Sequence, residues 1–162
     1  MNAAVAWSAL AVILVAVYVT WTAGRLDRIH ARVDAAWAAL DAQLVRRSAA
    51  ARALGVPLVS AAADAALEAS PADRQYRENE LSQALRSAWP AVPPGPVRDE
   101  LAAAASRVSL ARSFHNGAVT NAQALRRKRM VRALHLAGHR DVPQFFDVDE
   151  TDFSDEAGPA AT

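Results

Sequence analysis

The sequence predicts an all-α protein in which an N-terminal transmembrane helix is followed by an antiparallel bundle of three to four helices. Three observations lead to this fold class. Of the 162 residues, 52% are hydrophobic, many of them alanine, and only six are glycine, a composition that favours helix. Residues 3–23 form an uncharged apolar run. Residues 25–47 repeat apolar side chains every three or four positions, which is the period of one helix face.

The distribution of charge divides the chain into three parts. All 18 Lys and Arg residues and ten of the 17 acidic residues lie within residues 25–140, and the other seven acids lie in residues 141–162. We therefore expect residues 1–24 to form an anchor, residues 25–140 a helical bundle, and residues 141–162 an acidic tail that is disordered from residue 147 onward. The chain has no cysteine, which excludes disulfides and thiolate metal sites.

The apolar run is long enough to cross a membrane. About 21 residues at about 1.5 Å each give roughly 31 Å, close to the thickness of a hydrocarbon core. Trp7 lies towards one end and Tyr18 and Trp21 towards the other, where aromatic rings prefer the headgroup region. A cleaved signal peptide is one alternative, but no basic residue precedes the run and no clear cleavage site follows it. A buried helix is the other, although a 17.3-kDa chain offers little interior for it.

The basic residues beside the run predict its orientation. Arg25, Arg28 and Arg32 follow it, and nothing basic precedes Ala3. Positively charged flanks stay in the cytoplasm. We therefore expect a single-pass protein of the cell membrane with its N-terminus outside and its C-terminal domain in the cytoplasm.

Glycine and proline divide the remaining chain into helical segments. The first helix should run from near Gly24 to Leu54, either continuous with the membrane helix or bent from it at Gly24. It should end at residues 55–57, Gly-Val-Pro. A second segment is expected over residues 58–69. The apolar stripe of the first helix is Leu26, Ile29, Val33, Trp37, Leu40 and Leu44, and that of the second segment is Leu58, Ala62, Ala65 and Ala69.

A third segment should begin at Ser70, with Ser70 as the N-cap and Pro71 at the first helical position. It should end near Ala88, before four prolines in residues 89–96 break the helix. The last helix is expected from Val97 to about residue 129. Two apolar stripes on it predict two neighbouring helices. The residues expected to be buried are Leu81, Ala84, Leu85, Ala88 and Trp89 in the third segment, then Leu101, Val108, His115 and Val119 in one stripe and Leu110, Phe114, Ala118 and Leu125 in the other.

Several short motifs occur in the order found in a known family. Residues 33–37 (VDAAW), followed by residues 40–47 (LDAQLVRR), resemble the opening helix of the LemA family. Residues 78–85 (ENELSQAL) are similar to its E-N-x-L-S-x-A-L segment, and residues 107–119 resemble its R-I-x-x-A-R-x-F-Y-N-x-A-V stretch. Residues 143–146 (PQFF) are similar to its P-x-x-F ending. The resemblance implies a membrane-anchored helical bundle and supplies no catalytic residues.

The chain departs from the family pattern at several positions. His115 stands where the family has tyrosine, Gly117 where it has an acidic residue, and Ala105-Ser106 where it has Glu-Asn. The middle of the chain is shortened, and a basic cluster replaces an apolar Phe-Pro-Gly segment. The sequence is therefore interpreted as a divergent member of this family.

Six polar residues near the predicted stripes are candidates for a network between helices. Such a network would specify which helices meet. Asp34 and Asp41 border the first apolar stripe, and asparagine inside a helix suggests an inter-helix hydrogen bond because it lowers helix propensity. Solvated flanks with local ion pairs are the ordinary alternative. The candidates are Asp34, Asp41, Asn79, Arg107, Arg112 and Asn116.

A basic cluster ends the last predicted helix. It could bind anionic lipid if that helix ends near the bilayer, or it could be a solvated helix end whose charges suit the helix dipole. Nucleic acid is not an expected partner, because interleaved aromatic residues are missing. The cluster consists of Arg126, Arg127, Lys128, Arg129 and Arg132.

A metal site is a weaker hypothesis. His135 and His139 in the stretch HLAGH are one helical turn apart and could bind a metal with Asp141. The glutamate of a hydrolytic HExxH site is missing, and Gly138 interrupts the helix. We expect no cofactor and no resident metal.

The features together predict a non-catalytic structural or scaffolding protein, held in membrane lipid by its N-terminal helix and associating with itself or with another membrane protein. Two alternatives remain open. One is a metal-assisted hydrolase using the HLAGH stretch. The other is a lipid-responsive electrostatic switch in which the acidic tail competes with lipid for the basic cluster.

Overall fold

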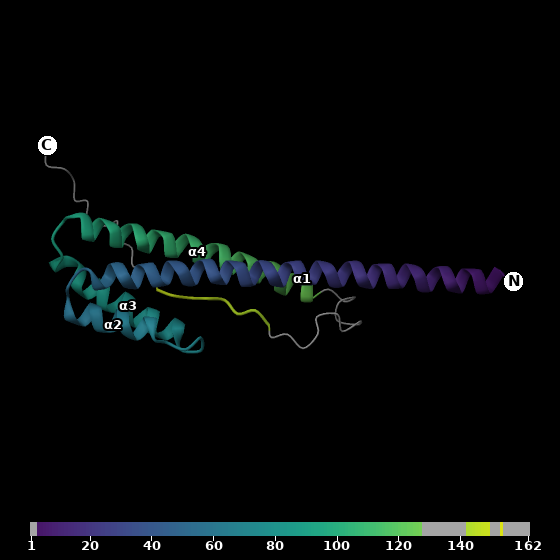
Figure 1. Ribbon diagram of the computed structural model, residues 1–162, viewed down its shortest axis with the longest axis horizontal. Coiled ribbons are helices and arrows are strands. Elements are labelled where there is room, and N and C mark those ends of the chain that lie inside the picture. Colours follow the sequence, from purple (N-terminus) through teal and green to yellow (C-terminus); the bar gives the residue numbers. More distant parts are fainter. Residues whose placement is uncertain (1–2, 128–141, 150–152, 154–162) are drawn as a thin grey trace, which may run out of the picture. The chain divides into compact units, whose positions relative to one another are not determined.

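A computed structural model describes residues 3–127, 142–149 and 153 (Figure 1). Its elements are α1 (Ala3–Arg52), α2 (Pro57–Leu67), α3 (Arg74–Ala88), the 3-10 helix η1 (Trp89–Ala91) and α4 (Pro96–Arg126). No strand occurs in these ranges. The expectation of an all-α fold is therefore confirmed for the described part of the chain.

Two compact units share α1 and α4. The first unit comprises Met1–Ala36 and Asn116–Phe145, and the second comprises Trp37–His115 and Phe146–Thr162. In the first, Val33 of α1 is buried against Val119 of α4 and its neighbours. In the second, α1 packs against α4, α2 and α3 in two hydrophobic clusters. Each unit thus has a small core of its own.

Helix α1 is continuous from the apolar run into the amphipathic stretch. Of the two alternatives at Gly24, the structure has the unbroken helix. Within the predicted stripe Val33, Leu40 and Leu44 are buried, and Ile29 and Trp37 are partly buried. The helix ends before Gly55, whose φ of 69° is in the left-handed region that glycine adopts at low cost. Pro57 then opens α2, as its lack of an amide hydrogen allows.

Helices α2 and α3 form an antiparallel hairpin in the second unit (Figure 1). The predicted face of α2 was wrong for Leu58, which is 64% exposed, although Ala62 of that face is partly buried against the core. The fully buried face is the neighbouring one, formed by Val59, Ala63 and Ala66. The apolar periodicity of α2 is ambiguous because nearly every position is alanine or another apolar residue, so only the direction of the hairpin selects the buried face.

The start of α3 was also predicted too early. The helix begins at Arg74, with Asp73 as N-cap, and residues 71–73 form a turn. Ser70 closes this turn, since its Oγ donates to Asp73 Oδ2 (2.7 Å) and accepts from the Asp73 amide (3.3 Å). The capping chemistry expected of Ser70 therefore stabilises the turn before the helix.

The burial expected for residues of the third segment is largely confirmed. Leu81, Ala84, Leu85 and Trp89 are buried in one cluster, and Ala88 is partly buried beside it. The proline-rich break follows, where Arg98 donates from Nη1 to the Val92 carbonyl (2.6 Å).

Helix α4 buries all of its first predicted stripe and half of its second. The first stripe, Leu101, Val108, His115 and Val119, is buried. In the second, Ala118 and Leu125 are buried, whereas Leu110 and Phe114 are 59% and 68% exposed. Within the second unit α4 meets its neighbours one after another along a single face: Leu101 packs with α2 and α3, and Val108 packs with α1. A single buried face is enough for that arrangement, so no described residue of the second unit covers Leu110 and Phe114.

Part of the expected tail is packed rather than disordered. Residues 142–149 are extended, and Phe146 and Val148 are buried among Leu40, Leu44 and Val108. Phe153 lies against Trp89, with ring centroids 3.9 Å apart. The prediction of disorder from residue 147 was therefore wrong for Val148 and Phe153. The packing comes from apolar residues that alternate with acidic ones in this stretch.

Candidate functional site

The most distinctive polar feature of the described chain is a buried ion pair between α1 and α3. Arg47 and Glu78 are both fully buried, and Arg47 Nη2 lies 2.5 Å from Glu78 Oε2. Arg47 also donates to the Glu78 carbonyl oxygen and to Ser82 Oγ, each at 3.2 Å. Ser82 in turn donates to the Glu78 carbonyl oxygen (3.0 Å). Burying these charges is possible because both are paired and hydrogen-bonded.

A second arginine extends this pair towards the surface. Arg74 Nε lies 3.1 Å from Glu78 Oε1, and Arg74 Nη2 lies 3.1 Å from Asp41 Oδ1. The Arg74 side chain is 9% exposed and that of Asp41 is 45% exposed, so the chain of contacts runs from the core to solvent. We call Asp41, Arg47, Arg74, Glu78 and Ser82 the α1–α3 network. Its two carboxylates balance its two guanidinium groups, so the network as a whole carries no net charge.

Polar contacts also hold the extended C-terminal segment in the second unit. Arg112 Nη1 donates to the Val148 carbonyl (2.8 Å), and the Asp149 amide donates to Asn79 Oδ1 (2.8 Å). Phe146 stacks edge-on against Trp37 at 5.4 Å, and Trp37 meets His115 at the same distance. Main-chain hydrogen bonds and buried aromatic contacts therefore act together on residues 146–149.

The six predicted network residues do not form one network. Asp41 joins the α1–α3 network, but Asp34 is exposed. Arg107 pairs with Glu100 of its own helix (2.6 Å), and Arg112 and Asn79 bind the C-terminal segment instead of another helix. Asn116 is partly buried, and its carbonyl accepts from Thr120 Oγ1 (2.9 Å).

The residues that carry the α1–α3 network were missed apart from Asp41. Arg47 is not among the residues of the predicted apolar stripe, and no motif in the sequence points to Arg74. Glu78 and Ser82 did carry a signal, since both lie in the segment resembling the LemA E-N-x-L-S pattern. A glutamate four residues before a serine in an amphipathic helix could have suggested a polar pair on its buried face.

Three side chains on the surface of α3 interact closely enough to shift one another's pKa values. Arg77 donates to Glu80 Oε2 (2.7 Å), and this bond, followed by a hydrogen bond from Tyr76, lowers the pKa of the Glu80 carboxyl. The same carboxylate raises the pKa of Tyr76. All three groups are exposed to solvent, so the cluster orders a surface and creates no reactive group.

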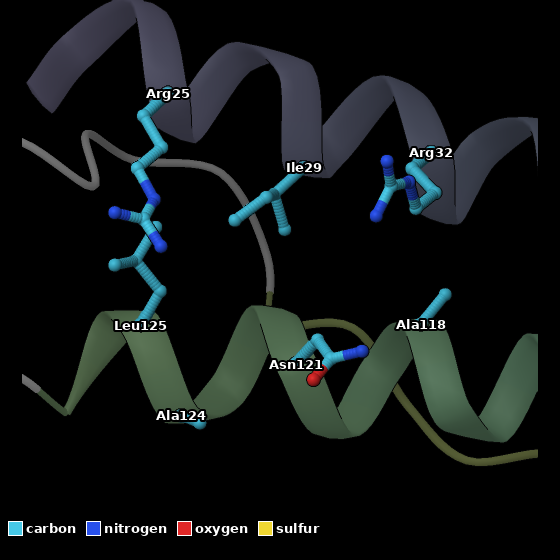
Figure 2. Close-up of a pocket in the computed structure, with 7 residues that line it drawn as sticks. All are labelled: Arg25, Ile29, Arg32, Ala118, Asn121, Ala124 and Leu125. Atoms are coloured by element: carbon cyan, nitrogen blue, oxygen red, sulfur yellow. The ribbon is translucent and has the colours of Figure 1, made fainter. Parts of the chain in front are cut away.

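A groove of about 380 Å³ lies in the first unit, between α1 and α4. Arg25 and Ile29 point from α1 towards α4, and Ala118 and Leu125 point back towards α1 (Figure 2). We call it the α1–α4 groove, and it is lined by Arg25, Ile29, Arg32, Ala118, Asn121, Ala124 and Leu125.

The basic cluster and the histidine motif lie partly or wholly outside the described residues. Arg126 and Arg127 are at the C-terminal end of α4. Lys128, Arg129 and Arg132 fall outside, as do His135, His139 and Asp141 of the metal hypothesis. Within the described ranges no group of three histidine, aspartate or glutamate side chains is placed to hold a metal ion.

Comparison with family models, with curated proteins and with solved structures found no match to this chain.

Proposed function

We propose that this chain is a single-pass membrane protein, a divergent member of the LemA family, whose cytoplasmic helices act as a non-catalytic scaffold. The observation that carries the proposal is the uncovered apolar surface of α1. Trp7, Val12 and Val17 are 71%, 68% and 61% exposed, and α1 contains a stretch long and apolar enough to cross a membrane. A contiguous apolar surface of this kind is rare on a soluble monomer.

The hydroxyl groups of this stretch agree with a lipid environment. Ser8 Oγ donates to the Val5 carbonyl (2.9 Å), Thr20 to Ala16 (2.9 Å) and Thr22 to Tyr18 (2.8 Å). Each hydroxyl is thus satisfied inside its own helix, as a hydrocarbon surrounding requires. At the end of the stretch, Arg25 lies over the Trp21 ring at 5.7 Å, a pairing suited to the headgroup region.

The family assignment is supported by where its motif residues lie. Glu78, Asn79 and Ser82 of the E-N-x-L-S segment make the polar contacts of α3 described above. Trp37 of the opening motif meets Phe146 of the P-x-x-F ending. Motifs far apart in sequence therefore serve contacts with one another, which is expected if they belong to one conserved packing scheme.

The scaffold role is supported by apolar side chains left uncovered on α4. Leu110 and Phe114 are one helical turn apart and more than half exposed. Anchoring confines copies of the chain to one plane, which raises their effective concentration for association. We therefore assign this Leu110–Phe114 face to contact with a second copy of the chain.

Membrane insertion is tested by alkaline extraction and by labelling. The full chain should stay in the membrane pellet at high pH, where peripheral proteins are released. The chain has no cysteine, so a single Ala3→Cys variant should react with an impermeant maleimide from outside the cell, whereas Ser106→Cys should react only after permeabilisation. Release at high pH refutes the anchor, and the reverse labelling pattern refutes the orientation.

Self-association is tested by cysteine crosslinking in the membrane. A Leu110→Cys variant should form disulfide-linked dimers under mild oxidation, and Glu100→Cys, an exposed position about 15 Å away along the same helix, is the matched control. Equal crosslinking at both positions would indicate random collision. Crosslinks only to other proteins would assign the face to a different membrane protein.

A further inference from the structure

We propose that the α1–α4 groove binds the phosphate headgroup of an anionic phospholipid, an inference that rests on the membrane anchor proposed above. The groove contains two arginines, one amide side chain and two large apolar residues, and no carboxylate lines it. Guanidinium groups bind phosphate oxygens through paired, charge-assisted hydrogen bonds. The lining is therefore complementary to an anion that is attached to apolar acyl chains.

The groove also begins at the depth where headgroups lie. Arg25 is two residues beyond the apolar run, about 3 Å along a helix axis. Ile29 and Arg32 follow one and two turns later, and long side chains on a helix lean towards its N-terminus, which here is the membrane side. A headgroup entering from the bilayer would therefore meet Arg25 first and then the side chain of Arg32.

The two arginines are available for an anion. Neither Arg25 nor Arg32 forms an ion pair with a carboxylate among the described residues. The nearest acids along α1, Asp27 and Asp34, are exposed and do not line the groove. Arg25 contacts the Trp21 ring, which positions its guanidinium without neutralising the charge.

The size of the groove suits part of a lipid. A volume of about 380 Å³ is at the lower end of the range of small-molecule sites, which is about 300–1,000 Å³. A glycerol phosphate headgroup fits that space, and the acyl chains would remain in the bilayer. Ile29 and Leu125 supply the apolar contact between the two regions.

The test uses the full chain in nanodiscs of mixed phosphatidylcholine and phosphatidylglycerol, with the retained lipid identified by native mass spectrometry. Wild type should retain phosphatidylglycerol selectively. Arg25→Gln/Arg32→Gln should lose this selectivity by on the order of a hundredfold, because two charge-assisted hydrogen bonds to the phosphate are removed. Arg28→Gln/Arg46→Gln removes the same charge from exposed positions outside the groove and should retain the lipid.

A charge-neutral pair of variants separates filling of the groove from loss of charge. Asn121→Trp places a large ring at an exposed lining position and should abolish retention, whereas Thr120→Trp, exposed and outside the lining, should not. Circular dichroism should show unchanged helix content in every variant.

The outcomes are distinguishable. Equal losses in the groove and control double variants would show general charge attraction and overturn the site, as would retention in Asn121→Trp. Binding of soluble glycerol phosphate to the protein in nanodiscs of phosphatidylcholine alone would reassign the groove to a soluble phosphate ester. Failure of the anchor itself appears separately, as release of wild type by alkaline extraction.

Discussion

The buried glutamate of α3 shows how one residue can determine a helix interface. Glu78 is fully buried and receives hydrogen bonds or ion-pair contacts from two arginines on different elements, Arg47 and Arg74. Replacing such a pair with apolar residues is often nearly neutral, but removing one partner leaves a buried charge without compensation. The network therefore matters more for which faces of α1 and α3 meet than for total stability.

Glu78→Gln should destabilise the protein by about 3 kcal/mol or more, because both arginines lose their buried anion. Urea unfolding of the full chain in detergent, followed by circular dichroism, measures this. Glu100→Gln is the control, since the exposed Glu100–Arg107 pair should contribute less than about 1 kcal/mol. Equal effects of the two substitutions would show that burial does not set the cost.

The Glu80 carboxylate should titrate below the ordinary glutamate value of 4.5, because Arg77 and then Tyr76 hydrogen-bond its charged form. A lowered folded-state pKa means that the stabilisation is present above the unfolded pKa and is lost as pH falls through the folded pKa. NMR titration of the side-chain carboxyl carbon measures the midpoint. Arg77→Gln should raise it towards 4.5, and an unchanged midpoint would contradict the assignment of cause.

At the scale of elements, apolar patterning was informative where one face differs clearly from the others. The described residues of the α1 stripe and those of the α3 stripe are buried or partly buried as predicted, because polar side chains mark the outer faces. In α2 alanine occupies both faces, and in α4 the second stripe is buried at Ala118 and Leu125 but exposed at Leu110 and Phe114. The α1–α3 network was not predictable in the same way, because it depends on which turn of α3 lies beside Arg47.

The extended C-terminal segment is the element for which composition was misleading. Phe146→Ala should cost about 3 kcal/mol or more, since Phe146 is 4% exposed and contacts Trp37. Hydrogen exchange of residues 142–149 should increase. Phe145→Ala is the matched control, because its neighbouring ring is 49% exposed and should cost little. Comparable exchange in the two variants would argue against anchoring by Phe146.

At the scale of the whole molecule, anchoring and folding should be separable. Leu14 lies in the apolar stretch and is 60% exposed, so Leu14→Arg removes no packing within the described chain. An arginine near the centre of a membrane helix costs about 2.5–3.5 kcal/mol on insertion scales. The variant should therefore be depleted from the membrane fraction while its urea midpoint in detergent stays at the wild-type value.

Ala31→Arg, at an exposed position beyond the apolar stretch, should change neither property. A lowered urea midpoint for Leu14→Arg would mean that the apolar stretch packs on the rest of the protein. That result would contradict the anchor and favour a covered helix.

The contacts that hold residues 146–149 depend strongly on the side chains of only two of these four residues. Arg112 and Asn79 hold carbonyl and amide atoms that every amino acid except proline provides, and the carboxylates of Asp147 and Asp149 are 88% and 62% exposed. Those carboxylates meet Arg112 (3.4 Å) and Arg86 (3.3 Å), but ion pairs this exposed contribute little. The buried contacts of Phe146 and Val148 therefore discriminate most strongly between side chains. Over evolutionary time, positions 147 and 149 should therefore diversify while 146 and 148 stay large and apolar.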